Sequence, residues 1–177
     1  MIDATHVHNM PQLLEALEHQ LGRRIILKFM EGQQVFELSA EAFFAQARCL
    51  AAVLAARNLR GRHIGIVGAN RVEWLAGFCA VFLADAVAVL LSPDLSSQEL
   101  ADRTAQADLG AILFDGALRD LIEGSELPSD LVLIDLDHVP DEAVLSTIIL
   151  QAAAFGVPGS LPKRSGIHRW QKQNPQR

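Results

Sequence analysis

The chain has 177 residues, of which 50% are hydrophobic, enough for one domain with a buried core. Its 15 basic and 21 acidic residues give a net charge of −6, so composition gives no reason to expect a nucleic-acid partner. The N-terminus shows no secretion signal and the cysteines show no zinc or haem spacing, so we expect a cytoplasmic protein with Cys49 and Cys79 as buried thiols.

The first third of the chain predicts a helix, a hairpin and a second helix. Leucines recur at helical spacing over Met10–Leu21. Two β-rich runs, Ile25–Met30 and Gln34–Leu38, flank a Glu-Gly-Gln turn and predict a hairpin. Ser39 is a suitable N-cap for a helix over Ala40–Arg57. The apolar side chains of that helix form one stripe, made of Phe43, Phe44, Ala47, Leu50, Ala51 and Leu54.

The next stretch predicts a strand, a helix and a second strand. His63–Val67 is β-rich, and Asn70 after it is a good N-cap. An apolar helix follows from about Arg71 to Ala84, and Ala86–Leu91 is a second apolar run. This succession is a βαβ unit, so we expect a parallel sheet covered by helices, with a buried helix and a buried second strand.

A membrane span is the alternative for part of this stretch, because Trp74–Leu91 has nearly the length of a spanning helix. Asp85 would then lie in the hydrocarbon, and the second half of the run alternates Val with Ala and ends at Ser92-Pro93. These features favour a helix followed by a strand, and we expect no membrane association.

Further helices and strands alternate downstream. Ser96 and Glu99 form a capping box at the start of a polar helix. Ala111–Phe114 and Leu131–Leu136 are apolar runs typical of strands, with a short helix predicted between them at Ala117–Ile122. The whole pattern predicts a doubly wound α/β fold, a mainly parallel sheet flanked by helices, with an N-terminal β-hairpin at its edge.

Periodicity weakens after about Val139, and the last twenty residues are basic and contain Pro and Gly. We therefore assign residues 1–140 to one α/β subdomain. Residues 141–177 are predicted to be an irregular or disordered tail.

Two consecutive stretches, G-R-H-I-G-I-V-G-A-N-R-V-E-W and F-L-A-D-A-V-A-V-L-L-S-P, resemble the N-terminal part of the AMP-forming acyl-CoA synthetase superfamily, the adenylate-forming or AMP-binding enzymes. The order and spacing of elements match that family from roughly Leu13 to Asp115. Asp85, Leu90 and Ser92 depart from it, standing where Gly, Pro and Asn are usual.

The resemblance implies a parent ligase that activates a carboxylate with ATP and Mg²⁺ and passes the acyl group to a thiol such as CoA. Such enzymes hold the ATP phosphates in a Ser/Thr-Ser-Gly-Thr-Thr-Gly-x-Pro-Lys-Gly loop. Here the nearest match is Gly159-Ser160-Leu161-Pro162-Lys163, which has the Pro-Lys pair of that loop but not its Thr/Ser-Gly run. We therefore expect a first subdomain cut short before the active site, by truncation or a change of reading frame. It would have no catalytic, cofactor-binding or metal-binding residues, and would itself need no cofactor.

Other candidate sites carry weaker signals. The Gly65–Asn70 run resembles a dinucleotide-binding turn but lacks its third glycine, which favours a simple tight turn. We expect Asp135 and Asp137 to face opposite ways at a strand end, so that they cannot share a metal. The histidines at positions 6, 8, 63, 138 and 168 are scattered, without a Ser, Cys or Asp at relay spacing.

Two functional hypotheses follow. The chain is either the N-terminal subdomain of such a synthetase, inactive alone, or a stand-alone interaction module that keeps the fold without the chemistry. In both cases the expected partner is the remainder of a synthetase or a second copy, contacted through the apolar face around Trp74 and Phe82.

Overall fold

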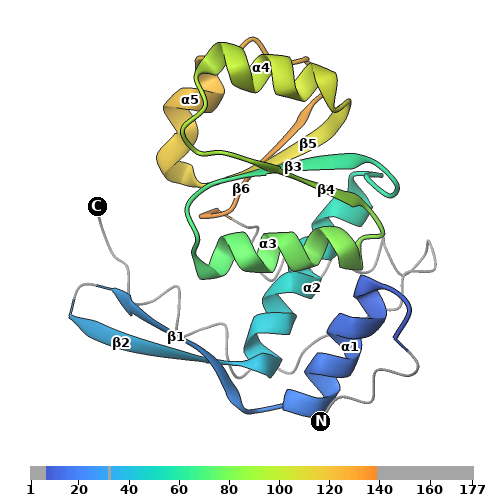
Figure 1. Ribbon diagram of the computed structural model, residues 1–177, viewed down its shortest axis with the longest axis vertical. Coiled ribbons are helices and arrows are strands. Elements are labelled where there is room, and N and C mark those ends of the chain that lie inside the picture. The colour runs from blue at the N-terminus through green and yellow to red at the C-terminus, as the bar shows by residue number, and fades with distance from the viewer. Residues whose placement is uncertain (1–6, 32, 139–177) are drawn as a thin grey trace.

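The computed structural model describes residues 7–31 and 33–138 (Figure 1). Its elements, in chain order, are α1 (Met10–Leu21), β1 (Ile25–Glu31), β2 (Gln34–Ser39), α2 (Ala40–Ala56), β3 (His63–Val67), α3 (Val72–Leu83), β4 (Val87–Leu91), α4 (Ser97–Gln106), β5 (Leu109–Phe114), the 3₁₀ turn η2 (Gly116–Leu118), α5 (Arg119–Glu123) and β6 (Val132–Asp135).

In the described part of the chain the main sheet has four parallel strands in the order β4-β3-β5-β6. Helix α3 covers one face, with α2 beside it, while α4 and α5 cover the other (Figure 1). Helix α2 and the sheet contribute to one core, and α4, α5 and the opposite sheet face contribute to another. The α/β prediction with a parallel sheet flanked by helices is confirmed.

The N-terminal hairpin forms where it was predicted but does not join the main sheet. Among the strands that the structure describes, β1 and β2 pair only with each other, and the hairpin extends away from the body of the molecule (Figure 1). Phe29 and Phe36 stack across it with ring centroids 5.6 Å apart, and Lys28 pairs with Glu37 at 2.6 Å. Because α1 and α2 lie at the base of the hairpin, it packs on them and not on the edge of the parallel sheet.

The predicted stripe of α2 is confirmed. All six of its apolar residues are buried, and the Ser39 hydroxyl caps the helix by accepting a hydrogen bond from the Ala42 N–H at 3.2 Å. Phe43 and Phe44 pack with α1 and the hairpin, while Leu50 and Leu54 pack toward the sheet. One helix thus joins the hairpin layer to the α/β layer.

The prediction that Asn70 caps α3 is wrong. The helix begins at Val72, so Arg71 occupies the N-cap position with extended backbone, and no side chain caps the first turn. Asn70 lies one residue too early for its side chain to reach the first-turn N–H groups. The Arg71 side chain is instead directed at carboxylates, described below.

Three of the sheet-connecting helices end in the same way. Asn58, Asp85 and Asp108 follow α2, α3 and α4 with φ of 57°, 57° and 48°, the left-handed region in which Asn and Asp are the best-tolerated residues after Gly. Asp85 therefore takes up the conformation of a glycine-like turn instead of reshaping it. Its carboxylate accepts hydrogen bonds from Arg60 Nε and NH2 at 2.9 and 2.7 Å.

Strand β4 is an edge strand, which corrects the expectation that it is buried. Val87 is 47% exposed and Leu90 56% exposed, whereas every residue of β5 is buried. The apolar run Trp74–Leu91 is divided between α3 and β4, and within the described part of the chain no helix has the length and apolar character of a membrane span.

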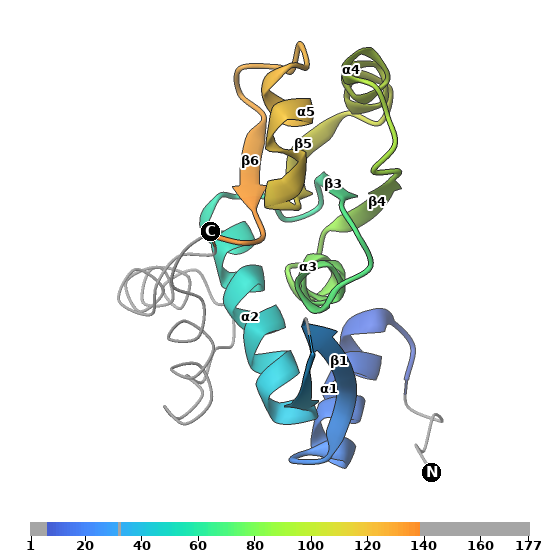
Figure 2. The same cartoon turned by 90° about the vertical axis from the view of Figure 1, so that its left-hand side faces the viewer.

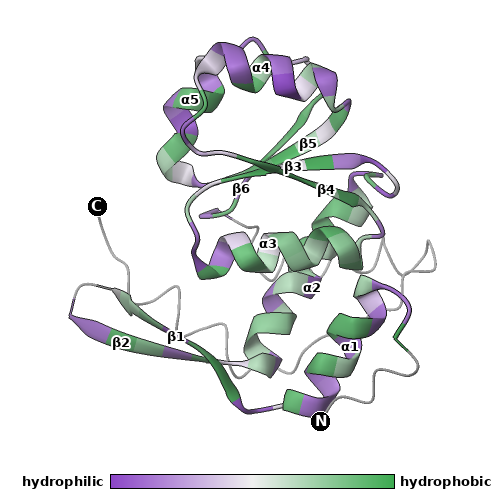
Figure 3. Cartoon of the chain, in the orientation of Figure 1, coloured by the Kyte–Doolittle hydropathy of each residue, from purple (hydrophilic) through white to green (hydrophobic). Residues whose placement is uncertain are grey.

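The downstream elements largely follow prediction. The capping box is formed, since Ser96 N–H donates to Glu99 Oε2 at 2.9 Å and Glu99 N–H donates to Ser96 Oγ at 3.3 Å. Helix α4 shows the most polar surface of the flanking helices in Figure 3, as expected of a helix with one buried side. The predicted helix at Ala117–Ile122 is instead η2 followed by α5. The predicted tail at residues 141–177 lies outside the described residues.

Candidate functional site

In an open α/β sheet, ligands bind outside the carboxyl ends of the strands, where neighbouring strands send their connections to opposite sides. Here that switch point lies between β3, whose chain continues to β4, and β5, whose chain continues to β6. The Asp115 N–H donates to the Val67 carbonyl at 3.1 Å, so the two strand ends are tied together at this point. The residues that follow β3, β5 and β6 therefore meet at one end of the sheet.

Arg71 is the centre of the charges gathered there. Its NH1 donates to Asp115 Oδ1 at 3.4 Å, its Nε lies 3.0 Å from Glu73 Oε2, and its NH2 contacts Asp137. The Nε and NH2 contacts have ion-pair distances without hydrogen-bond alignment, although both nitrogens are buried. The guanidinium thus joins three carboxylates from three separate parts of the chain.

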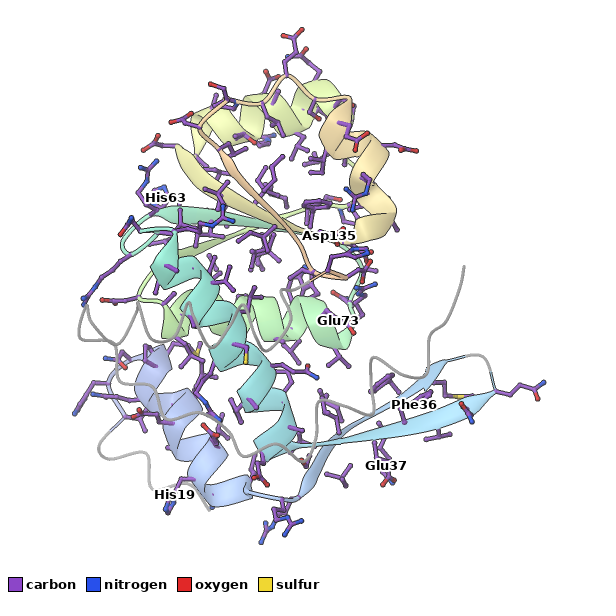
Figure 4. All side chains as sticks on the ribbon, turned by 180° about the vertical axis from the view of Figure 1, so that it is seen from behind. His19, Phe36, Glu37, His63, Glu73 and Asp135 are labelled. Atoms are coloured by element: carbon purple, nitrogen blue, oxygen red, sulfur yellow. The ribbon has the colours of Figure 1, made fainter. Side chains whose placement is uncertain are left out.

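A second group forms around Asp135 at the end of β6. Its carboxylate pairs with Arg119 and lies 2.9 Å from His138 Nδ1, and it also accepts the Asp137 N–H at 2.9 Å. Figure 4 shows Glu73 and Asp135 at one end of the sheet and His63 at the opposite end. We call the combined set the strand-end cluster: Arg71, Glu73, Asp115, Arg119, Asp135, Asp137 and His138.

Glycines let the backbone approach this cluster closely. A Cβ at Gly68 would lie 2.9 Å from the Asp115 Cβ, and one at Gly116 would lie 2.5 Å from Asp137 Oδ2. Gly116 N–H also donates to Asp137 at 3.1 Å. At these two glycines the backbone is consequently packed against Asp115 and Asp137 of the cluster.

The cluster corrects the expectation for Asp135 and Asp137. The strand ends at Asp135 and the chain turns there, so both carboxylates lie beside Gly116 and do not point apart. Both are already engaged by arginines. No group of three His, Cys, Asp or Glu side chains in the described residues is arranged to hold a metal ion.

Two of the histidines that the structure describes, His63 and His138, have partners at their rings. His63 Nδ1 lies 2.6 Å from the Ala107 carbonyl, and His138 has Asp135 as its neighbour, which sequence spacing did not reveal. His6 and His168 lie outside the described residues. Neither pairing places a nucleophile beside a base.

Trp74 and Phe82 belong to an aromatic row along α3. Trp74 stacks on Phe78 with centroids 5.8 Å apart, and Phe78 meets Phe82 edge to face at 4.9 Å. All three side chains are partly buried against the core. Of the two cysteines predicted to be buried, Cys79 is buried and Cys49 only partly so. Burial raises the pKa of the Cys79 thiol to about 11.

Sequence reasoning singled out Asp135 and Asp137 but missed Arg71, Asp115 and Arg119. The available signal was that charged residues follow three neighbouring strands, β3, β5 and β6, within a few positions. In parallel sheets such positions converge, whatever their separation along the chain.

Comparison with known proteins gives one family and many structures. The model of the family described as AMP-binding enzyme matches residues 14–176, whereas no curated protein matches the sequence. A nonribosomal peptide synthetase bound to alpha-methyl-L-serine-AMP superposes with a TM-score of 0.65 and 17% identity, over 75% of this chain and 14% of that chain.

Two smaller ligases give similar superpositions. The fatty acid AMP ligase from Legionella pneumophila has a TM-score of 0.64 and 12% identity, over 80% of this chain and 25% of that one. O-succinylbenzoate coenzyme A synthetase from Bacillus subtilis, in complex with AMP, has a TM-score of 0.59 and 25% identity, over 74% and 32%. This chain thus corresponds to a third or less of each solved structure.

Proposed function

The chain belongs to the AMP-binding enzyme family, and from that premise we propose that it is the N-terminal subdomain of an adenylate-forming ligase and does not catalyse adenylation alone. The parent enzyme would use ATP and Mg²⁺ to convert a carboxylate into an acyl-adenylate and then pass the acyl group to a thiol such as CoA. This subdomain would pack against the second one and form part of the wall of the carboxylate pocket, in the cytoplasm.

The observation that carries this proposal is the pairing of charges at the switch point. The strand-end cluster stands where an α/β sheet receives a ligand, and its aspartates are paired with Arg71 and Arg119. The sequence also lacks the Ser/Thr-Gly run that would hold ATP phosphates, and Gly159–Lys163 is its nearest approach. The family supplies the fold of a ligase, and these residues supply no phosphate site of their own.

The face that would meet the rest of a synthetase is the one proposed from sequence, around Trp74 and Phe82. The aromatic row on α3 is only partly buried, so it retains apolar surface for a neighbouring layer. Helix α3 lies on the side of the sheet away from α4 and α5 (Figure 1). A second α/β layer packed there would complete the burial of this row.

The direct test is carboxylate-dependent ATP–pyrophosphate exchange by the purified 177-residue chain, with ATP binding followed by calorimetry. We expect neither exchange nor binding, while an intact ligase of the same family, as a positive control, gives both. Exchange above background would overturn the proposal. In that case the Lys163→Ala variant would show whether the Gly159–Lys163 segment holds ATP.

A second candidate, a stand-alone interaction module, is favoured by apolar side chains exposed at several places. Met30 and Val35 on the hairpin are 69% and 63% exposed, and β4 adds two more exposed residues. A module predicts a monodisperse protein or a defined symmetric oligomer, whereas an isolated subdomain predicts self-association or aggregation through its exposed apolar surface. Light scattering coupled to size exclusion distinguishes them.

A further inference from the structure

Strand β4 is an unprotected sheet edge. Among residues 7–31 and 33–138 it pairs with β3 alone, and it runs along the rim of the sheet (Figure 2). Its five residues, Val87 to Leu91, include no charge and no proline, although proteins normally use both to block edge-to-edge pairing. The opposite edge differs, because β6 ends in Asp135, which is held by Arg119.

The backbone of β4 offers hydrogen-bonding groups at the open edge. The Val87 N–H donates to the Arg62 carbonyl at 3.0 Å, so Val87 faces β3. Successive residues of a strand alternate in direction, and therefore Val89 and Leu91 also bond to β3. The N–H and C=O groups of Ala88 and Leu90 point outward and have no strand partner within the described part of the chain.

We propose that this edge binds a second copy of the chain, β4 against β4 in antiparallel orientation about a two-fold axis at Val89. In that register each outward-facing Ala88 lies opposite the partner's Leu90. Antiparallel pairing forms both hydrogen bonds of such a pair, so four backbone bonds close the interface. The two sheets then continue as one across the axis.

The side chains suit this register. Ala88 lies on the sheet face that packs toward α2 and α3, and Leu90 is on the same face and 56% exposed. Pairing places each large exposed leucine over a small alanine. On the other face Val87 lies opposite the partner's Leu91, and the two copies of Val89 meet at the axis.

The strand brings no like charges together in this register, because all five residues from Val87 to Leu91 are uncharged. Because the interface is isologous, it closes as a dimer, whereas a β4-to-β6 contact would produce open-ended filaments.

The test is sedimentation equilibrium of the full chain at several concentrations, with Leu90→Lys and, as matched control, Leu133→Lys on the exposed part of β6. We expect a monomer–dimer equilibrium whose dissociation constant rises at least about tenfold in Leu90→Lys and is unchanged in Leu133→Lys. Circular dichroism verifies that both variants are folded. A monomer at all concentrations, filaments, or equal effects of the two substitutions would refute the proposal.

A cross-link tests the register independently. The Val89→Cys variant should form a disulfide-linked dimer under mild oxidation, because residues opposite each other on the axis approach closely enough for this bond. Adding Leu90→Lys should abolish the cross-link. Equal cross-linking with and without Leu90→Lys would show that the contact does not depend on β4 pairing. Both results are independent of the exchange assay, so this proposal and the proposed function fail separately.

Discussion

Replacing Arg71 tests whether the strand-end cluster stabilises the fold. The Arg71→Met variant keeps most of the side-chain volume and removes the charge, which leaves Asp115, only 5% exposed, without its cation. At the observed 3.4 Å an effective dielectric constant of 20 gives a gross attraction of about 5 kcal/mol for this pair. Desolvation cancels part of that, and breaking a fully buried pair typically costs about 3–5 kcal/mol.

The Arg71 side chain is 31% exposed, so we expect a smaller loss of unfolding free energy, about 2–3 kcal/mol. In urea the midpoint should fall by about 1–2 M. The control is Arg60→Met, which breaks the Arg60–Asp85 pair, whose side chains are 80% and 67% exposed, and should cost no more than about 1 kcal/mol. Equal losses in the two variants would refute the argument that the cluster holds the strand ends together.

Three further predictions concern single contacts. The Cys79 thiol, with its pKa raised to about 11, stays protonated in the folded chain while the unfolded thiol ionises, so the free energy of unfolding should fall by about 1–3 kcal/mol between pH 9 and 11. Over this pH range the urea midpoint of Cys79→Ala should fall less steeply than that of the wild type, and identical slopes would contradict the prediction. Ser96→Ala should cost about 1 kcal/mol by thermal unfolding because α4 loses its capping box. Ser125→Ala, which removes a single hydrogen bond from a half-buried hydroxyl to the Leu121 carbonyl, is the milder comparison. Gly68→Ala should cost about 1–3 kcal/mol because its Cβ would meet Asp115 at 2.9 Å, and a stability equal to wild type would show that the loop can move aside.

Elements with strong local signals were predictable from sequence. Met10–Leu21 is a helix between the predicted residues, Ser39 caps α2, and Ser96 with Glu99 forms the capping box, because each depends on residues within one turn of one another. The strands were found for the same reason, since an apolar run bounded by polar turns is visible in a short window.

The site was not predictable, because its residues are close only in three dimensions. Arg71 and Asp115 are 44 positions apart, and they meet because β5 pairs with β3 and not with β4. The exposure of β4 has the same origin, since its apolar run alone does not reveal whether a strand has neighbours on both sides. Strand order carries this information, and it is not a local property of the sequence.

The order β4-β3-β5-β6 also bears on how the chain assembles as it leaves the ribosome. Once Leu91 has emerged, β3 and β4 can pair, and β5 and then β6 each find a partner strand that has already been made. No inner position has to be kept open for a later insertion, so the sheet can grow during synthesis in one direction only. Strand β5 pairs with the free edge of β3, and β6 then pairs with the free edge of β5. None of the later strands that the structure describes pairs with the outer edge of β4.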